Sequence, residues 1–403
     1  MRGFAARSTV EDAIRWSDEH SAALASVIEP LERAHGRVLA EDIVAPIDVP
    51  AFDRSAMDGY ALRADETSGA GIYNPLAFRV IGQSLPGRAY RGEAAAGEAV
   101  RIMTGAPLPA GADAVVPAEA AREVEGRVEI TEAAAVGKNV GRVGEDIAAG
   151  TMVLHRGRRL RPQDVGVIAS LGLAQVPVVR QPRVRIVVTG NELVRPGDER
   201  GEHQIFEANS SLLAGLIARD GGEIESVRHV PDDRGSIRAA LEEPGADVVL
   251  VSGGSSVGAE DHAPTLVAEL GELAIHGIAM RPSSPTGMGR IREILVFLLP
   301  GNPVSCLCAY DFFAGRAIRR LGGRSSDWPY RSSVETVARK IVSAVGRVDY
   351  CRVRRDAGGI VPLAISGASI LSSTTRADGF VIVRAESEGH APGEQVTVLW
   401  YDE

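Results

Sequence analysis

Strand–helix alternation between residues 183 and 320 is the feature that most constrains the fold. Predicted strands at 184–188, 224–230, 247–251 and 294–299 alternate with helical spacing at 210–219, 237–241 and 304–320. Buried strands separated by amphipathic helices are typical of a parallel sheet that carries helices on both faces. We therefore predict a parallel α/β domain over residues 181–325.

Three of these predicted strands end in loops that indicate a binding site. The loops are residues 189–193 (TGNEL), 252–258 (SGGSSVG) and 300–303 (PGNP). Small residues in the second loop allow backbone N–H groups to approach an anion closely, and a phosphate is the expected guest. Ligands of such sheets bind at the carboxyl ends of the strands, so we expect the three loops to converge there.

Acidic residues near these loops would supply hard oxygen ligands for Mg²⁺, namely Glu192, Asp232, Asp233 and Asp261. Asp261 stands at a helix entrance, where it would either cap the helix or hold a cation. Asp232 and Asp233 also precede a helical pattern, which favours capping. Asn209 is predicted mainly as a helix N-cap, with ligand contact as the alternative.

The rest of the chain divides into segments that differ in hydrophobic spacing and in glycine and proline content. Residues 8–35 have helical spacing, residues 76–150 carry many glycines and prolines between short β-branched runs, and alternating segments appear at 379–384 and 395–400. We predict a discontinuous α+β linker subdomain (1–47 and 148–180), a small β domain (48–147), the parallel α/β domain (181–325) and a C-terminal β domain of barrel-like form (326–403).

Composition narrows the class of protein. The 403 residues include 53 acidic and 44 basic side chains, and the net charge of -9 argues against broad nucleic-acid binding. Three cysteines are too few for a disulfide framework, and Cys306 and Cys308 lack a second pair to make a metal site. Without a long apolar run or an apolar leader, we expect a cytoplasmic protein that does not enter a membrane.

Seven motifs together resemble a known family. The chain is similar to the molybdopterin molybdenumtransferases, the MoeA and gephyrin E-domain proteins, through PAFDRSAMDGYAL, RIMTGAPLPAGADAVV, GEDI, TGNEL, SGGSSVGAED, LPGNPVS and SGASILSS, in this order. The resemblance implies a four-part architecture with a MoaB/MogA-like molybdopterin-binding domain. It also implies a homodimer whose cleft lies between the α/β domain of one subunit and the small β domain of the other.

The resemblance further implies a reaction and its participants. The reaction is Mg²⁺-dependent insertion of molybdate into adenylylated molybdopterin, which releases AMP and molybdenum cofactor. Contacts with molybdopterin adenylyltransferase and with acceptor molybdoenzymes are expected. The implied catalytic residues are Asp58, Glu192 and Asp261, of which Glu192 and Asp261 would also face the metal. The implied substrate-binding residues are Thr104, Asp146, Asp232, Ser252, Gly253, Gly254, Ser256, Gly258, Arg281, Pro300, Gly301, Asn302 and Ser373, with Ser372 as the alternative to Ser373.

The sequence also departs from the family pattern. A lysine-rich K-x-x-x-K-P-G-K-P segment is replaced by residues 277–285, in which Arg281 retains a charge but Gly277 and Ser284 do not. Asn191 replaces a common Asp, and Gly141 stands where an arginine is expected. His276, Arg290 and Arg292 are candidates to restore charge. The retained acids favour the transferase, the lost lysines favour a molybdopterin carrier, and a metal-dependent pyrophosphate hydrolase is the third alternative.

Overall fold

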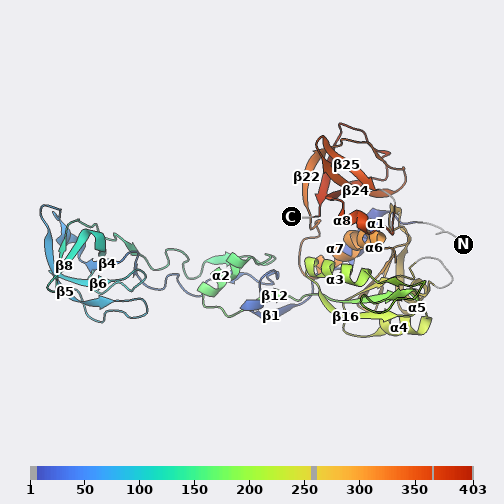
Figure 1. Cartoon of the computed structure of the whole chain (residues 1–403). Helices are drawn as coiled ribbons and strands as arrows, with labels where there is room; N and C mark the ends of the chain where they lie inside the picture. The colour runs from blue at the N-terminus through green and yellow to red at the C-terminus, as the bar shows by residue number, and fades with distance from the viewer. Residues whose placement is uncertain (1–6, 256–260, 365–366, 402–403) are drawn as a thin grey trace. The chain divides into compact units, whose positions relative to one another are not determined.

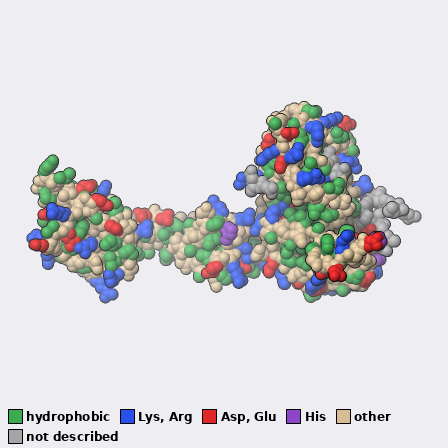
Figure 2. Space-filling view, in the orientation of Figure 1, with side chains coloured by type: hydrophobic (Ala, Val, Ile, Leu, Met, Phe, Trp, Pro, Cys, Tyr) green, Lys and Arg blue, Asp and Glu red, His purple; other side chains and the backbone are tan. Residues whose placement is uncertain are grey.

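The computed structural model describes residues 7–255, 261–364 and 367–401 (Figure 1). Contacts divide the chain into two compact units, one of residues 1–28, 36–40 and 177–403, and the other of residues 29–35 and 41–176. Within the described ranges, we find no helix with both the length and the apolar character needed to span a bilayer. On the face shown in Figure 2, basic side chains are interspersed with acidic ones.

The larger unit contains a six-stranded sheet with the order β16-β13-β17-β21-β20-β18. Its strands are β13 (Arg183–Thr189), β16 (Glu223–Val230), β17 (Val248–Ser252), β18 (Glu272–His276), β20 (Gly287–Ile291) and β21 (Ile294–Leu299). The first four in the sheet order are parallel, and β20 pairs antiparallel both with β21 and with the edge strand β18. The prediction of a wholly parallel sheet is therefore wrong at one edge. Only two residues connect β20 to β21, and so short a link permits a hairpin but no crossover.

Helices cover both faces of this sheet, as the alternation predicted. They are α3 (Asn209–Asp220), α4 (Arg234–Glu242), α5 (His262–Leu270), α6 (Pro303–Ala309) and α7 (Gly315–Leu321), with a π-helical turn, Tyr310–Ala314, between the last two. Successive strand side chains point to opposite faces. Ile186 accordingly packs in one core cluster with residues of α3, α6 and α7, and its neighbour Val187 packs in another with residues of α4 and α5.

The C-terminal part of the same unit is a second sheet with the order β19-β24-β26-β28-β22, in which β25 pairs with β24. Its strands are β19 (Met280–Arg281), β22 (Arg331–Thr336), β24 (Val348–Asp356), β25 (Gly359–Ala364), β26 (Gly379–Val383) and β28 (Gln395–Trp400), next to the pair β23 (Ile341–Val342) and β27 (Gly389–His390). β19 leaves the α/β domain and pairs with β24, so the two domains share a strand contact. The strands predicted near residues 379–384 and 395–400 are confirmed.

The smaller unit is built on a sheet with the order β7-β4-β6-β5-β9-β8. Its strands are β4 (Gly59–Leu62), β5 (Leu76–Ser84), β6 (Glu98–Ile102), β7 (Ala114–Pro117), β8 (Ala121–Val124) and β9 (Arg127–Ile130). Further short pairs are β3 (Arg54–Ser55) with β10 (Val140–Gly141), and β2 (Ile43–Val44) with β11 (Met152–Leu154), which precedes α2 (Pro162–Ser170). The chain before residue 45 therefore contacts the chain after residue 150 within this unit.

The first helical prediction is only half right. α1 spans Val10–Glu19 and is capped by Thr9, but residues predicted to continue it form β1 (Ser26–Pro30) and a 3₁₀ turn, Leu31–Arg33. Burial along β1 alternates residue by residue, which is the period of a strand. Pro30 has no amide hydrogen to give to a helix, so the second apolar stripe is extended instead.

Candidate functional site

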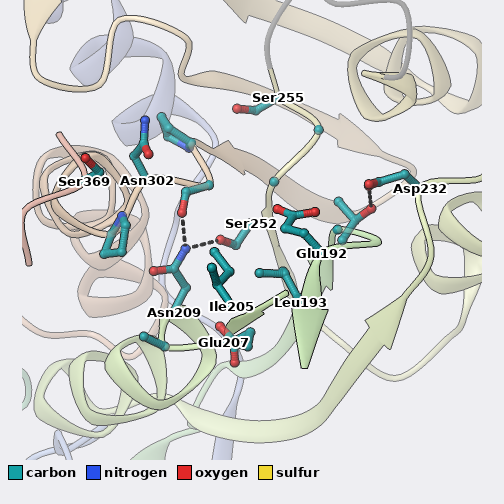
Figure 3. A pocket seen from close by; sticks show the side chains of 18 of the residues that line it. Glu192, Leu193, Ile205, Glu207, Asn209, Asp232, Ser252, Ser255, Asn302 and Ser369 are labelled. Carbon is teal, nitrogen blue, oxygen red and sulfur yellow. Dashed lines mark hydrogen bonds between the residues drawn. The ribbon is translucent and has the colours of Figure 1, made fainter. Parts of the chain in front are cut away.

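The three predicted loops converge on a cavity of about 870 Å³ at the carboxyl ends of β13, β17 and β21. Figure 3 shows Asp232 and Glu192 on one side of it and Asn302 and Ser369 on the other. Nine predicted site residues line the cavity: Glu192, Asp232, Ser252, Gly253, Gly254, Asp261, Pro300, Gly301 and Asn302. Ser256 and Gly258 lie outside the described residues.

Glycines bring the loop backbones together at the base of the cavity. Gly253 has φ +100° and its N–H donates to the carbonyl oxygen of Leu299 at 3.2 Å. A Cβ atom placed on Gly253 would lie 2.3 Å from the carbonyl oxygen of Thr189, and one on Gly301 would lie 3.5 Å from the Cα of Gly253. The loops therefore meet backbone to backbone at this point, and binding of an anion by the glycine loop stays a prediction.

We expect Gly253→Ala to destabilise the protein by about 1–3 kcal/mol, because alanine is strained at this φ and its Cβ would collide with backbone. Urea unfolding would measure the change. Gly215→Ala is the matched control, since Gly215 lies within α3 and an added Cβ there would have no atom within 4 Å. The control is expected to gain about 0.5–1 kcal/mol. Equal stabilities of the two variants would contradict the close approach.

Asp232 and Asp233 have different roles. Asp233 caps α4 and accepts from the N–H groups of Gly235 and Ser236, both at 2.9 Å. Asp232 accepts instead from the hydroxyl of Thr189 and from the N–H of Asn191, the latter at 3.1 Å. The capping interpretation is therefore correct for Asp233 and wrong for Asp232. The hydrogen bonds of Asp232 connect the end of β13 to the end of β16 at the cavity.

Four carboxylates line the cavity, and two of them, Asp232 and Glu207, accept hydrogen bonds from neighbouring residues. The other two, Glu192 and Asp261, are those predicted to face a cation. Glu192 is exposed, and its Oε2 lies 2.9 Å from where a Cβ on Gly190 would stand. Asp261 occupies the N-cap position of α5, yet among the described residues its side chain makes no capping hydrogen bond to that helix. The capping alternative for Asp261 is therefore wrong, while the cation alternative stays a prediction.

The carboxylates in this cavity fit a magnesium ion whose remaining ligands would be phosphate oxygens and water. Among the described residues, no group of three or more His, Cys, Asp or Glu side chains is arranged as a metal site. Mg²⁺ is commonly bound through only one or two carboxylates, with phosphate oxygens and water completing the octahedron. Glu192 and Asp261, beside a glycine loop in one cavity, match that pattern.

Arg281 lies in a second cavity of about 850 Å³, which shares Pro285, Pro300 and Asn302 with the first. Its guanidinium is bonded to the buried carboxylate of Asp349, with Nε 3.1 Å from Oδ1. Arg281 thus lines the cavity that adjoins the predicted phosphate site and does not line that site itself.

The second cavity also holds donors without a protein partner in the described ranges. Ser284 Oγ and Arg347 Nε are buried and have no hydrogen-bond partner among the described residues. Arg347 Nε is 3.5 Å from Asp349 Oδ1, which is ion-pair distance only. Buried polar groups are normally satisfied, which sets these two atoms apart from the other polar atoms at the cavity.

Of the residues considered as replacements for the missing lysines, His276 is the one next to the glycine loop. Its Nε2 lies 2.9 Å from the carbonyl oxygen of Ser255. Arg290 pairs with Glu272 at 3.1 Å on the strand edge, and Arg292 stands in the β20–β21 turn with φ +54°. Neither arginine is among the residues that line the two cavities.

Two predicted residues near the cavity make hydrogen bonds that the sequence did not indicate. Ser373, in the short helix α8 (Ser372–Thr375), is buried and donates to the carbonyl oxygen of Ile370 at 2.6 Å, whereas Ser369 of the same motif lines the first cavity. Asn209 is the first residue of α3 and not its N-cap, which is Ala208. Its side chain bridges two of the loops instead, and no periodicity in the sequence could indicate such a contact.

The remaining predicted residues form a separate group in the smaller unit. One carboxylate oxygen of Asp58 accepts from the backbone N–H of Thr104 at 2.7 Å and from its hydroxyl at 2.8 Å. These donations, the backbone one first, lower the pKa of Asp58. Asp146 is exposed, and its N–H donates to the carbonyl oxygen of Val49. The pairing of Asp58 with Thr104 keeps this acid ionised.

We expect Thr104→Val to raise the pKa of Asp58 part of the way to its usual value, because the hydroxyl donor is lost and the N–H donor remains. The bond stabilises the fold at any pH above the unfolded pKa near 3.8 and is lost as pH falls through the lower folded pKa. The pH-dependent part of the stability should therefore be smaller in the variant, and its loss should be complete at a higher pH. A carboxyl NMR titration would measure it, with Thr131→Val, whose hydroxyl donates to Ala120, as control; an unmoved Asp58 pKa would contradict the assignment.

Comparison with known proteins now identifies the family. Three family models match in order: "MoeA N-terminal region (domain I and II)" over residues 8–172, "Probable molybdopterin binding domain" over 185–320, and "MoeA C-terminal region (domain IV)" over 336–401. The chain belongs to the MoeA family. The multidomain α/β plus β architecture expected from the sequence is confirmed with it.

Relatives match along nearly the whole chain. Molybdopterin molybdenumtransferase 2 of Mycobacterium tuberculosis is 36% identical over 97% of this chain and 98% of its own. Molybdopterin molybdenumtransferase of Haemophilus influenzae is 33% identical over 91% and 92%. The crystal structure of the molybdopterin biosynthesis MoeA protein of Pyrococcus horikoshii aligns with a TM-score of 0.83 at 34% identity, covering 99% of this chain and 100% of that one. MoeA membership places the chain in molybdenum cofactor biosynthesis, among proteins named as transferases.

Proposed function

We propose that this MoeA protein inserts molybdate into adenylylated molybdopterin in a Mg²⁺-dependent reaction that releases AMP and molybdenum cofactor. The observation that supports this most is the pair of adjoining cavities in one unit. The first has a glycine loop and four carboxylates, and the second has arginines and two buried polar atoms, Ser284 Oγ and Arg347 Nε, that make no hydrogen bond to a described residue. Two differently charged cavities with a common wall suit a reaction between a phosphate ester and a free oxyanion.

The first cavity would bind the phosphate end of the pterin substrate. The N–H of Gly253 already donates to Leu299, so the backbone N–H of Gly254 is the loop donor that would face phosphate oxygens, as at other glycine loops. Glu192 and Asp261 would hold Mg²⁺, which offsets the negative charge that develops on phosphoanhydride and oxyanion oxygens. The ion that these carboxylates would hold would thereby let a polyanionic substrate enter a cavity lined by acidic residues.

The second cavity would bind the molybdate. Arg281 and Arg347 line it, and the buried donors Ser284 Oγ and Arg347 Nε would donate to the bound oxyanion. A tetrahedral dianion presents an acceptor oxygen in every direction, so it would satisfy donors on several walls at once. Because Pro300 and Asn302 line both cavities, the oxyanion would lie next to the bound pterin.

We further propose a cytoplasmic homodimer, on the strength of the family resemblance. In that arrangement the Asp58–Thr104 group of one subunit would complete the cleft of the other, which gives this ionised acid a catalytic use. Contacts with molybdopterin adenylyltransferase and with acceptor molybdoenzymes belong to the same proposal. Light scattering of the purified protein tests the first step, and a monomeric mass would contradict a shared cleft.

The deciding experiment is AMP release from adenylylated molybdopterin by the purified protein with Mg²⁺, with and without molybdate. Molybdate-dependent release supports the transferase. Tight binding of the pterin without AMP release would instead indicate the carrier favoured by the lost lysines. Release that ignores molybdate would indicate a pyrophosphate hydrolase. Tungstate in place of molybdate shows which oxyanion the second cavity prefers.

A further inference from the structure

Asn209 connects the two loops that form the base of the first cavity. Its side chain is 6% exposed. Its Nδ2 donates to Ser252 Oγ at 2.8 Å and to the carbonyl oxygen of Gly301 at 2.7 Å, as the dashed lines in Figure 3 show. One amide group thus links the start of α3 to the loop after β17 and to the loop after β21.

The chemistry of its partners fixes the orientation of this amide. The carbonyl oxygen of Gly301 can only accept, so the –NH₂ end of Asn209 must face it. Asn209 Oδ1 then points elsewhere, and it is buried without a hydrogen-bond partner among the described residues. An unpaired buried carbonyl oxygen is destabilising, so the amide is not placed for stability alone.

The bridge stands where the sheet no longer holds the strands in register. The ladder between β17 and β21 ends at the pair Ser252 and Leu299. Beyond it, the N–H of Gly253 returns to Leu299, and Asn209 spans the gap from Ser252 to Gly301. The segment that it fixes, residues 300–302, includes Pro300 and Asn302, which line both cavities.

We infer that Asn209 is a positioning residue, which sets the distance between the phosphate loop and the wall that the two cavities share. The inference rests on the proposed function, because this distance would align the pterin with the oxyanion. The loop N–H groups themselves remain when Asn209 changes, so binding of the pterin is maintained. Alignment is lost, and kcat falls more than KM changes.

Asn209→Asp is the test variant because it changes hydrogen-bonding chemistry at almost constant shape. A carboxylate would face the carbonyl oxygen of Gly301 with no proton to donate, whereas a protonated carboxyl group would regain one donor. We expect kcat to fall by about 10- to 100-fold with little change in KM, since small misplacements of reacting groups have effects of this size. The ratio of variant to parent kcat should rise as pH is lowered.

Two controls separate positioning from loss of fold. Asn209→Ala should lose kcat similarly at every pH, because it has no proton to regain. Asn74→Asp, at an exposed turn where the amide donates to Gly69, should leave kcat unchanged. Unaltered kcat in Asn209→Asp, or a loss with no recovery at low pH, would overturn the inference.

Amide hydrogen exchange tests the bridging role of Asn209 without any measurement of turnover. In Asn209→Asp, the amides of residues 253–255 and of Gly301 and Asn302 should exchange faster together, while those of β13 stay as in the parent. If the parent shows no molybdate-dependent AMP release, the proposed function is wrong and this exchange decides the bridging role alone. Exchange equal to that of the parent in both loops would overturn it.

Discussion

Asp261→Asn is expected to lower molybdate-dependent AMP release by about 100-fold or more, the size of effect seen when one electrostatic contact to a reacting group is removed. Asn is nearly isosteric with Asp but cannot offer a charged oxygen to a cation. Asp261 lines the cavity close to the glycine loop, where a Cβ on Gly254 would be 4.0 Å from its Oδ1. Asparagine is about as good as aspartate at the N-cap position that Asp261 occupies, so the stability of the helix should be unaffected.

Asp233→Asn is the matched control for this prediction. Asp233 is also an acid at a helix entrance of the same domain, but its carboxylate caps α4 and does not line the cavity. Asparagine caps helices about as well as aspartate, so the control should keep both stability and turnover. Steady-state AMP release at several Mg²⁺ concentrations, with thermal unfolding alongside, measures both. If Asp261→Asn turns over at the parent rate at low Mg²⁺, Asp261 has no role in holding the cation.

The location of the candidate site can be predicted from the sequence, but the hydrogen-bond partners of its individual side chains cannot. Convergence of the loops at 189–193, 252–255 and 300–303 follows from strand order and the geometry of parallel strands, both of which leave a local pattern of apolar runs and glycines. The division of labour between Asp232 and Asp233 does not, because two adjacent acids before a helix look alike until the strand beside them is placed. Their separate partners are set by tertiary structure.

The wrong predictions have the same origin. The apolar residues of β1 fit a helical period as well as a strand period over so short a run, and pairing within the fold decides for the strand. Ser373 and Ser369 lie in one motif, and only the turn into α8 shows which hydroxyl faces the cavity. Asn209 gives a capping signal that is correct for its position at a helix start, while its real contacts join residues 43 and 92 positions away.

Arg281→Ala is expected to destabilise the protein by about 3 kcal/mol, at the lower end of what breaking one side of a buried ion pair does. Asp349 is fully buried, and its carboxylate is paired with Arg281, with Ser343 Oγ at 2.7 Å and with Arg347 at 3.5 Å. Without Arg281 the buried charge would keep only the weaker partners. The expected loss is at the low end because the Arg281 side chain is 30% exposed and water can enter.

A double-mutant cycle tests whether stability or oxyanion binding is the main role of Arg281. In Arg281→Ala/Asp349→Ala the stranded charge is gone, so urea unfolding should show less destabilisation than the sum of the single variants. Arg281→Lys should fall between parent and Arg281→Ala, since it keeps the charge but cannot make the two-pronged contact. A higher KM for molybdate in Arg281→Ala, with unfolding unchanged, would make Arg281 an oxyanion ligand and leave the ion pair incidental. If stability falls and that KM is constant, Asp349 neutralises Arg281, and the positive charge for the oxyanion comes from Arg347.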